Sequence, residues 1–202
     1  MVDRKQFSQT YYDKANEEEA FKDYAPFRYG KVEQDPIVAA RVEALRKDLD
    51  PILVDIVDGG IEAAIIEAEA AVERTARSTI IREQHDYRAS LNTLDCLSVS
   101  RVSWAATADP IRMKFPAEKI LEGDVFIYND VYESAGTIGH LPDYCVVTPI
   151  FWAERLTGFA QIFGHVNDVG GRVAGSWPST STSIFEEGTI CPPVKLYEKG
   201  QL

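Results

Sequence analysis

Apolar residues recur at steps of three and four over residues 52–80, which is the spacing of one helix face. The stripe consists of Val54, Val57, Ile61, Ile65, Ala68, Val72 and Thr75. Glu62, Glu69 and Glu73 fall off the stripe, as residues of a solvated face do. Two glycines at 59–60 interrupt the pattern, and each costs about 1 kcal/mol inside a helix. They therefore predict either a bend or an unusually close contact.

The hydrophobic period changes to two after residue 88. This alternation predicts four strands, at 91–104, 124–129, 144–152 and 158–165. The last two flank residues 153–157, a hairpin loop of ordinary length. Residues 169–193 are rich in Gly, Ser, Thr and Pro, which predicts a long functional loop. Helices followed by strands favour the α+β class, with N-terminal helices and a mainly antiparallel sheet.

The first 49 residues differ in composition from the rest. Charged and aromatic residues mix over 1–35, which predicts an arm lying on another surface, because a solvated tail has little use for aromatic side chains. Asp35 and Pro36 then supply the cap and first residue of a short helix. We therefore predict an N-terminal extension over 1–49 and a domain over 50–202.

Charge and cysteine content narrow the class of protein. The 202 residues carry a net charge of −11, which disfavours nucleic acid and anionic membrane as partners. No apolar run has the length of a signal peptide core or a transmembrane helix. The three cysteines lie far apart and form neither a disulfide framework nor a Cys-x-x-Cys metal site. These features predict a cytoplasmic protein.

The sequence His-x-x-Asp occurs twice in one short segment, at His140–Asp143 and at His165–Asp168. Imidazole with carboxylate is a ligand set that suits zinc, manganese or iron. Most single histidines are hydrogen-bonded core or turn residues, but two identical pairs favour a metal or acid–base site. Asp130 follows a predicted strand and is expected at the same rim, with an ordinary Asx turn as an equal alternative.

The third histidine, His85, stands next to Asp86 between two arginines. We interpret this pair as solvated or structural rather than as ligands. The sequence has no Gly-x-x-x-x-Gly-Lys-Ser/Thr phosphate loop and no Gly-x-Gly-x-x-Gly after a strand. Any nucleotide is therefore expected to bind elsewhere.

A series of further motifs runs in order along the chain, at 73–78, 86–87, 122–130, 140–149, 168–171, 175–178, 184–188 and 192–195. In this order they resemble the N-terminal part of the hydantoinase B/5-oxoprolinase family, which includes the large metal-bearing subunits of ATP-dependent acetone and acetophenone carboxylases. The resemblance covers about residues 50–202. Val166, directly after His165, is more similar to the ketone carboxylase branch.

The resemblance implies a role for each candidate residue. His140, Asp143 and His165 would bind a divalent metal, zinc or manganese, with Asp168 as a fourth ligand or as a partner of His165. Asp168 and Asp130 are the expected catalytic carboxylates. The implied partners are other carboxylase subunits, including an ATP-binding hydantoinase A-like subunit, and the substrates are a ketone and bicarbonate. Such a metal would stabilise an enolate oxygen as a Lewis acid.

Three functions remain open from the sequence. The first is a metal-binding piece of an ATP-dependent ketone carboxylase. The second, in the same family, is ATP-dependent hydrolysis of a hydantoin or 5-oxoproline. The third is a non-catalytic assembly subunit. It is favoured by residues 104–109, where the family's histidine-bearing segment is missing, by the altered region after Asp130, with Val131 in place of a proline, and by the aromatic arm over 1–35. Family members run on for several hundred residues, so we expect a fragment or one piece of a split subunit.

Overall fold

The structure is a computed structural model that describes residues 49–99, 108–134 and 136–202. The chain forms two compact units, Met1–Val54 and Asp55–Leu202, and the second contains the sheet. The predicted arm and the short helix after Asp35 lie outside the described residues. The elements are α3 (Pro51–Thr75), α4 (Thr79–Gln84), β1 (Tyr87–Thr93), α5 (Asp109–Lys114), η2 (Ala117–Lys119), β2 (Val125–Tyr128), β3 (Asp143–Trp152), β4 (Arg155–His165), η3 (Ile184–Glu186) and β5 (Val194–Tyr197).

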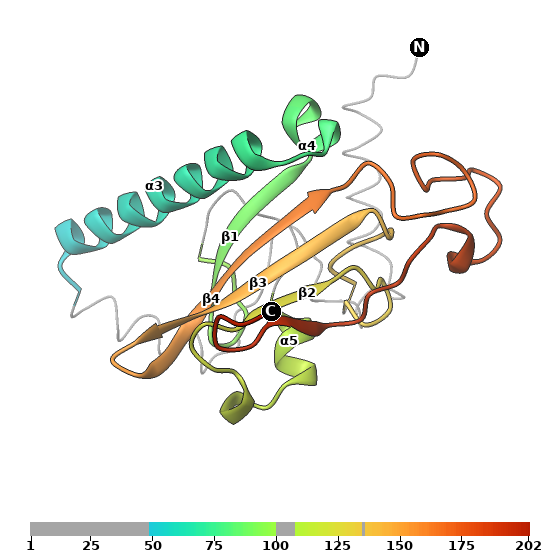
Figure 1. The fold of residues 1–202 in the computed structure, drawn as a ribbon. Helices are drawn as coiled ribbons and strands as arrows, with labels where there is room; N and C mark the ends of the chain where they lie inside the picture. Colours follow the sequence, from blue (N-terminus) through green and yellow to red (C-terminus); the bar gives the residue numbers. More distant parts are fainter. Residues whose placement is uncertain (1–48, 100–107, 135) are drawn as a thin grey trace, which may run out of the picture. The chain divides into compact units, whose positions relative to one another are not determined.

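The five strands form one sheet in the order β1-β4-β3-β2-β5, and each neighbouring pair is antiparallel (Figure 1). Helices followed by an antiparallel sheet confirm the α+β prediction. The β3–β4 hairpin closes through Ala153 and Glu154, whose φ angles of 48° and 62° are those of a tight two-residue turn. The predicted five-residue loop at 153–157 was therefore too long, because β4 already begins at Arg155.

The first predicted strand was placed too late in the chain. β1 begins at Tyr87 and ends at Thr93, where the chain turns. The N–H of Thr93 donates to the carbonyl of Leu97, and the N–H of Cys96 donates back to the carbonyl of Thr93. This turn ends the strand although the apolar alternation continues beyond it. Residues 100–104 of the predicted strand lie outside the described residues.

One face of the sheet forms the main hydrophobic core. Five fully buried side chains from three adjacent strands share this face, namely Phe126, Tyr128, Cys145, Val147 and Phe159. Ile111 of α5 and Ile120, which follows η2, are buried in the same cluster. The core is thus built from β2, β3 and β4 and is covered by the short α5 segment.

The other face carries the C-terminal half of α3. The Tyr87 hydroxyl donates to Glu73 at 2.9 Å, and the Ala89 N–H donates to Glu69 at 3.1 Å. The prediction of a solvated face for these two glutamates was therefore wrong, because both reach the backbone or side chains of β1. Toward the other end of α3 the apolar stripe is exposed, with Val54 at 44% and Val57 at 52%.

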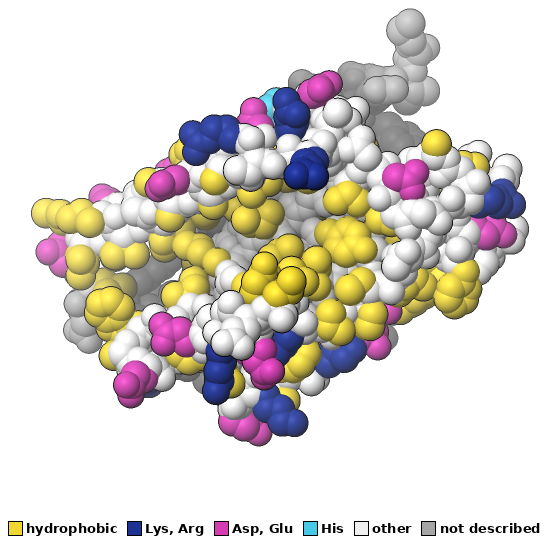
Figure 2. Space-filling view, viewed as in Figure 1, with side chains coloured by type: hydrophobic (Ala, Val, Ile, Leu, Met, Phe, Trp, Pro, Cys, Tyr) yellow, Lys and Arg dark blue, Asp and Glu magenta, His cyan; other side chains and the backbone are white. Residues whose placement is uncertain are grey.

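The glycine pair of α3 does not mark a close contact. The helix is continuous from Pro51 to Thr75, and a Cβ at Gly59 or Gly60 would meet nothing within 4 Å. Further along, the small side chains of Ala64 and Ala68 leave a cavity of about 240 Å³ between α3 and the sheet. Figure 2 shows hydrophobic side chains gathered around this hollow.

Of the helices in the described segments, none combines the length and apolarity that crossing a membrane requires.

A buried carboxylate joins β2 to the C-terminal β5 segment. Asp124 accepts hydrogen bonds from the N–H groups of Leu121 and Lys199, and it forms a 2.9 Å ion pair with Lys195. Its side chain is fully buried. Burial raises the pKa of Asp124, but these hydrogen bonds and the Lys195 charge outweigh burial and hold the pKa below its usual range.

Asp124→Asn is expected to lower the free energy of unfolding by about 3 kcal/mol at neutral pH, because it leaves the Lys195 charge poorly compensated. The folded pKa of Asp124 lies below the unfolded value of about 3.9. Its stabilising contribution is therefore complete above that value and is lost as the pH falls through the folded pKa. Urea unfolding between pH 7 and pH 3 should show a flatter pH dependence for the variant.

Glu122→Gln is the matched control, because Glu122 is exposed two residues earlier in the same turn. We expect it to change the free energy of unfolding by no more than about 0.5 kcal/mol. Equal effects of the two substitutions would show that the Asp124–Lys195 pair does not join these strands.

Candidate metal site

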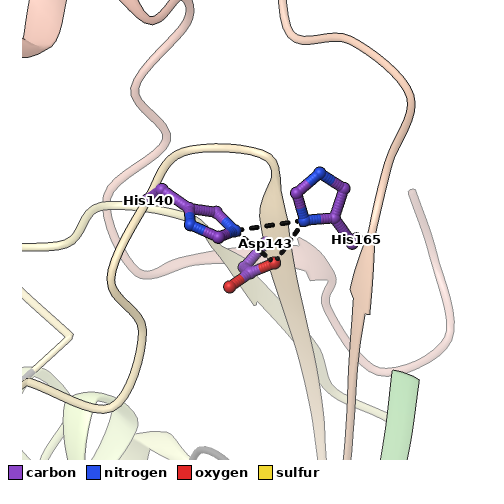
Figure 3. A group of neighbouring side chains, drawn as sticks. All are labelled: His140, Asp143 and His165. Carbon is purple, nitrogen blue, oxygen red and sulfur yellow. Dashed lines mark hydrogen bonds and ion pairs between the residues drawn. The ribbon is translucent and has the colours of Figure 1, made fainter. Parts of the chain in front are cut away.

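The β3–β4 ladder places three ligand-type side chains at one rim of the sheet. Its last pair is Asp143, the first residue of β3, opposite His165, the last residue of β4. His140 lies in the turn that leads into β3, where its carbonyl accepts a hydrogen bond from the Asp143 N–H. Figure 3 shows the two imidazoles and the carboxylate pointing toward one another.

The ligand atoms of this group form a nearly equilateral triangle. His140 Nε2 and His165 Nδ1 are 3.1 Å apart, and each lies 3.0 Å from Asp143 Oδ1. His165 is buried, and Asp143 and His140 are partly buried. Such a triangle of two imidazole nitrogens and one carboxylate oxygen is suited to hold a metal cation.

The local charges favour a cation at this position. The hydrogen bond with Asp143 raises the pKa of His140 and outweighs the lowering effect of burial. The carboxylates of Asp86 and Glu187 add to the same upward effect. A positive charge is therefore stabilised here, and a divalent ion would take the place of the proton, because imidazole binds metal in its neutral form.

Contacts from distant segments hold the backbone of His165. Its N–H donates to the carbonyl of Asp86 at 3.0 Å, and its carbonyl accepts from the Ser78 hydroxyl at 2.8 Å. Ser78 is also the N-cap residue of α4. The adjacent Val166 N–H donates to the carbonyl of Pro142, one residue before Asp143. The backbone of His165 is thus fixed through both the sheet and a helix cap.

A model of the hydantoinase B/oxoprolinase family matches residues 50–202. The chain belongs to this family. It is 32% identical to the caprolactamase β subunit of Pseudomonas jessenii over 162 residues, and 31% identical to 5-oxoprolinase 1 of Arabidopsis thaliana over 182 residues. These alignments cover 76% and 86% of this chain but 27% and 14% of the relatives. The chain thus spans about a quarter or less of their length.

Two solved structures share the fold of this chain. The ATP-dependent caprolactamase from Pseudomonas jessenii superposes with a TM-score of 0.65 at 30% identity, covering 76% of this chain and 27% of that one. The nucleotide-free structure of an acetone carboxylase superposes with a TM-score of 0.64 at 21% identity, covering 79% of this chain and 22% of that one. The second likeness concerns the fold alone.

Asp86 is a neighbour of the triangle that the sequence interpretation missed. His85 is indeed exposed and lies 3.6 Å from Glu73. Asp86 places Oδ2 3.8 Å from His165 Nδ1, although its side chain is half exposed and it does not belong to the triangle of ligand atoms. His85 and Asp86 have different surroundings because the His165 N–H donates to the Asp86 carbonyl, which extends the β1–β4 pairing by one residue. Only the strand register could have revealed this contact.

The other two predicted site residues bond within their own loops. The Asp168 carboxylate accepts from Gly170 N–H, Gly175 N–H and the Ser176 hydroxyl, which hold its pKa below the usual range. Asp130 accepts from the N–H groups two and three residues later, in an Asx turn. Neither belongs to the triangle of converging ligand atoms. Their catalytic roles stay predictions.

Asn129 is a second residue that sequence reasoning missed. Its fully buried amide donates to the carbonyls of Leu141 and Thr189 and accepts from the Cys191 N–H at 2.6 Å. It therefore joins the turn that carries His140 to the segment that leads into β5. The sequence offered one signal for Asn129, namely a polar residue at the buried end of an alternating strand.

Asn129→Ala is expected to lower the free energy of unfolding by about 3 kcal/mol or more, because it leaves two carbonyls and one N–H without their partner. Urea unfolding at neutral pH measures the loss. Asp130→Asn is the matched neighbour, since asparagine keeps the Asx-turn acceptor, and it should cost no more than about 0.5 kcal/mol. An Asn129→Ala loss below about 1 kcal/mol would contradict the bridging role.

Proposed function

We propose that this chain binds one divalent metal ion through His140, Asp143 and His165, and that the ion acts on a carbonyl compound in an ATP-dependent reaction. The observation that carries the proposal is the convergence of three ligand atoms within 3.1 Å of one another. These side chains come from the turn before β3 and from the facing ends of two paired strands, so the arrangement is built into the hairpin.

The spacing of the ligand atoms supports a metal site. Ligands bound at about 2.1 Å lie about 3.0 Å apart on one face of an octahedron and about 3.4 Å apart on a tetrahedron. The observed separations of 3.0–3.1 Å therefore suit an octahedral ion directly and a tetrahedral one after a small outward shift. Manganese and zinc both fit the chemistry of these ligands.

A divalent ion at this position would supply a Lewis acid for a carbonyl oxygen. Asp143 would serve as the anionic ligand and would also keep both imidazoles directed at the ion. Asp86 adds a half-exposed carboxylate beside His165, where it can bind the ion or accept a proton during the reaction. ATP would be bound by a partner subunit of the hydantoinase A type, in a cytoplasmic complex.

Two carbonyl substrates fit this site equally. The caprolactamase and 5-oxoprolinase relatives, at 31–32% identity, support ring opening of a cyclic amide. The fold of acetone carboxylase and the His165-Val166 sequence support carboxylation of a ketone with bicarbonate, with the ion stabilising the enolate. The same ion would polarise the amide carbonyl in the first reaction and the ketone carbonyl in the second.

The metal prediction is tested by elemental analysis of the purified full chain and of the complex it forms. We expect about one divalent ion per chain, and its loss in His140→Ala and His165→Ala, because each substitution removes one of three ligands. His85→Ala is the matched control, since this histidine is exposed and bonds elsewhere. Asp86→Asn should weaken binding by roughly 10- to 100-fold, as loss of a supporting carboxylate does.

Equal metal content in the histidine variants and the wild type would refute the site. A metal-free chain inside a fully active complex would leave the assembly-subunit function as the explanation. In that case His140→Ala would also leave the activity of the complex unchanged.

The substrate class is tested by assaying ATP turnover of the assembled complex with a lactam, a hydantoin, 5-oxoproline and small alkyl and aryl ketones. The ketone reactions are run with and without bicarbonate. ATP turnover that requires a cyclic amide, and that does not change with bicarbonate, would select hydrolysis. Turnover that requires both a ketone and bicarbonate would select carboxylation. In both cases His165→Ala should abolish the coupled reaction.

A further inference from the structure

The loop after β4 is held in place by a ring of hydrogen bonds centred on two side chains. Asp168 accepts from the Ser176 hydroxyl at 2.8 Å and from the Gly175 N–H at 2.9 Å. The Ser176 oxygen in turn accepts from the N–H groups of Val169 and Gly171, at 2.9 and 3.0 Å. Residues 168–171 and 175–176 are thereby tied to each other.

This hydrogen-bonded ring fixes an unfavourable backbone conformation. Ser176 is buried and has a φ of 55°, in the left-handed region that non-glycine residues rarely adopt. The loop also packs too closely for a side chain at Gly171, where a Cβ would lie 2.5 Å from the Glu187 carbonyl oxygen. Such a conformation persists only where its surroundings impose it, and strained residues of this kind gather at functional sites.

The residue that this turn directs is Trp177. Its ring centroid lies 4.4 Å from that of His140 and 6.0 Å from that of His165, and it is nearly parallel to the His165 ring. Trp177 nevertheless remains 65% exposed. The indole therefore contacts both proposed imidazole ligands and leaves a large apolar surface open beside them.

We infer that Trp177 is a specificity-determining wall of the proposed metal site, and that Asp168 is the positioning residue that holds it there through Ser176. The inference rests on the proposed function. A carbonyl oxygen bound to the ion would bring its substituents close to the exposed indole. The site therefore takes carbonyl compounds that carry a flat apolar or aromatic group, which gain a stacking contact that small substituents do not make.

This positioning role gives the Asp168 carboxylate a function that does not require it to touch metal or substrate. Both of its oxygens accept hydrogen bonds from the loop, Oδ1 from Gly170 and Ser176 and Oδ2 from Gly175. An oxygen that accepts from an N–H or O–H group is less available to a cation or to a reacting proton. Loss of Asp168 should therefore displace Trp177 rather than remove the metal.

The positioning claim is tested on the full chain with Ni²⁺, which quenches tryptophan fluorescence at short range. We expect Ni²⁺ to quench the wild type and Trp152→Phe, but to quench Trp177→Phe far less. Trp152 is the matched control, because it lies at the opposite end of β3, about 30 Å from Asp143. Asp168→Ala should bind Ni²⁺ within about twofold of the wild-type affinity and yet lose the quenching.

Wild-type quenching in Asp168→Ala would overturn the inference. So would a tenfold or larger loss of Ni²⁺ affinity in that variant, which would place Asp168 at the metal itself. If the wild-type chain binds no Ni²⁺, the proposed metal function fails, and near-ultraviolet circular dichroism without metal still decides the positioning claim. The Trp177 band, taken as wild type minus Trp177→Phe, should be absent in Asp168→Ala, and its persistence would overturn the claim.

The specificity claim is tested with two hydroxamates that present the same metal-binding group beside a phenyl or a methyl substituent. The Ni²⁺-loaded chain should bind benzohydroxamate about two- to tenfold more tightly than acetohydroxamate, the range that one aromatic contact supplies. Trp177→Ala should abolish this preference and Trp177→Phe should keep most of it. A preference that survives in Trp177→Ala would overturn the claim, even if Asp168→Ala fails to fold.

Discussion

The pairing of Asp143 with His165 at the end of the β3–β4 ladder is the constraint on which the candidate site depends. Because side chains alternate along a strand, a slip of one residue would send one of the two to the opposite face. The register at the rim is set by the turn at Ala153 and Glu154 together with a one-residue shift in the pairing between Ile150 and Phe151. The turn and this shift together decide whether ligand atoms about 30 Å away can meet.

Contacts from other segments then make this arrangement rigid. Ser78 joins the α4 cap to the carbonyl of His165, and Asn129 joins the turn after His140 to the segment before β5. Each of these polar groups is buried and bonded, which is the condition under which a polar contact specifies one geometry. The candidate site is therefore held in place by residues outside the triangle of ligand atoms.

The strands β2, β3 and β4 could be predicted from local patterns, whereas β1 was placed too late and β5 was not predicted. The error in the hairpin loop does not affect the candidate site. Ending the loop at residue 157 would pair Trp152 with Gly158 and hence His165 with Cys145, instead of Asp143. That register differs by two residues, so it leaves His165 on the same face. By contrast, Asp86, Asn129 and Trp177 reach the site through contacts between segments far apart in the chain, which no local pattern reveals.

The whole triangle of ligand atoms comes from one antiparallel strand pair and its leading turn, although the chain spans only about a quarter of its caprolactamase relative. Antiparallel neighbours joined by a short turn form with few long-range contacts. The candidate metal site is therefore contained in this hairpin and the segments that support it. Asp86 and Trp177 belong to neither strand of the hairpin. Substitutions at these two positions would change the surroundings of the ligand atoms without altering the strand pairing that brings those atoms together.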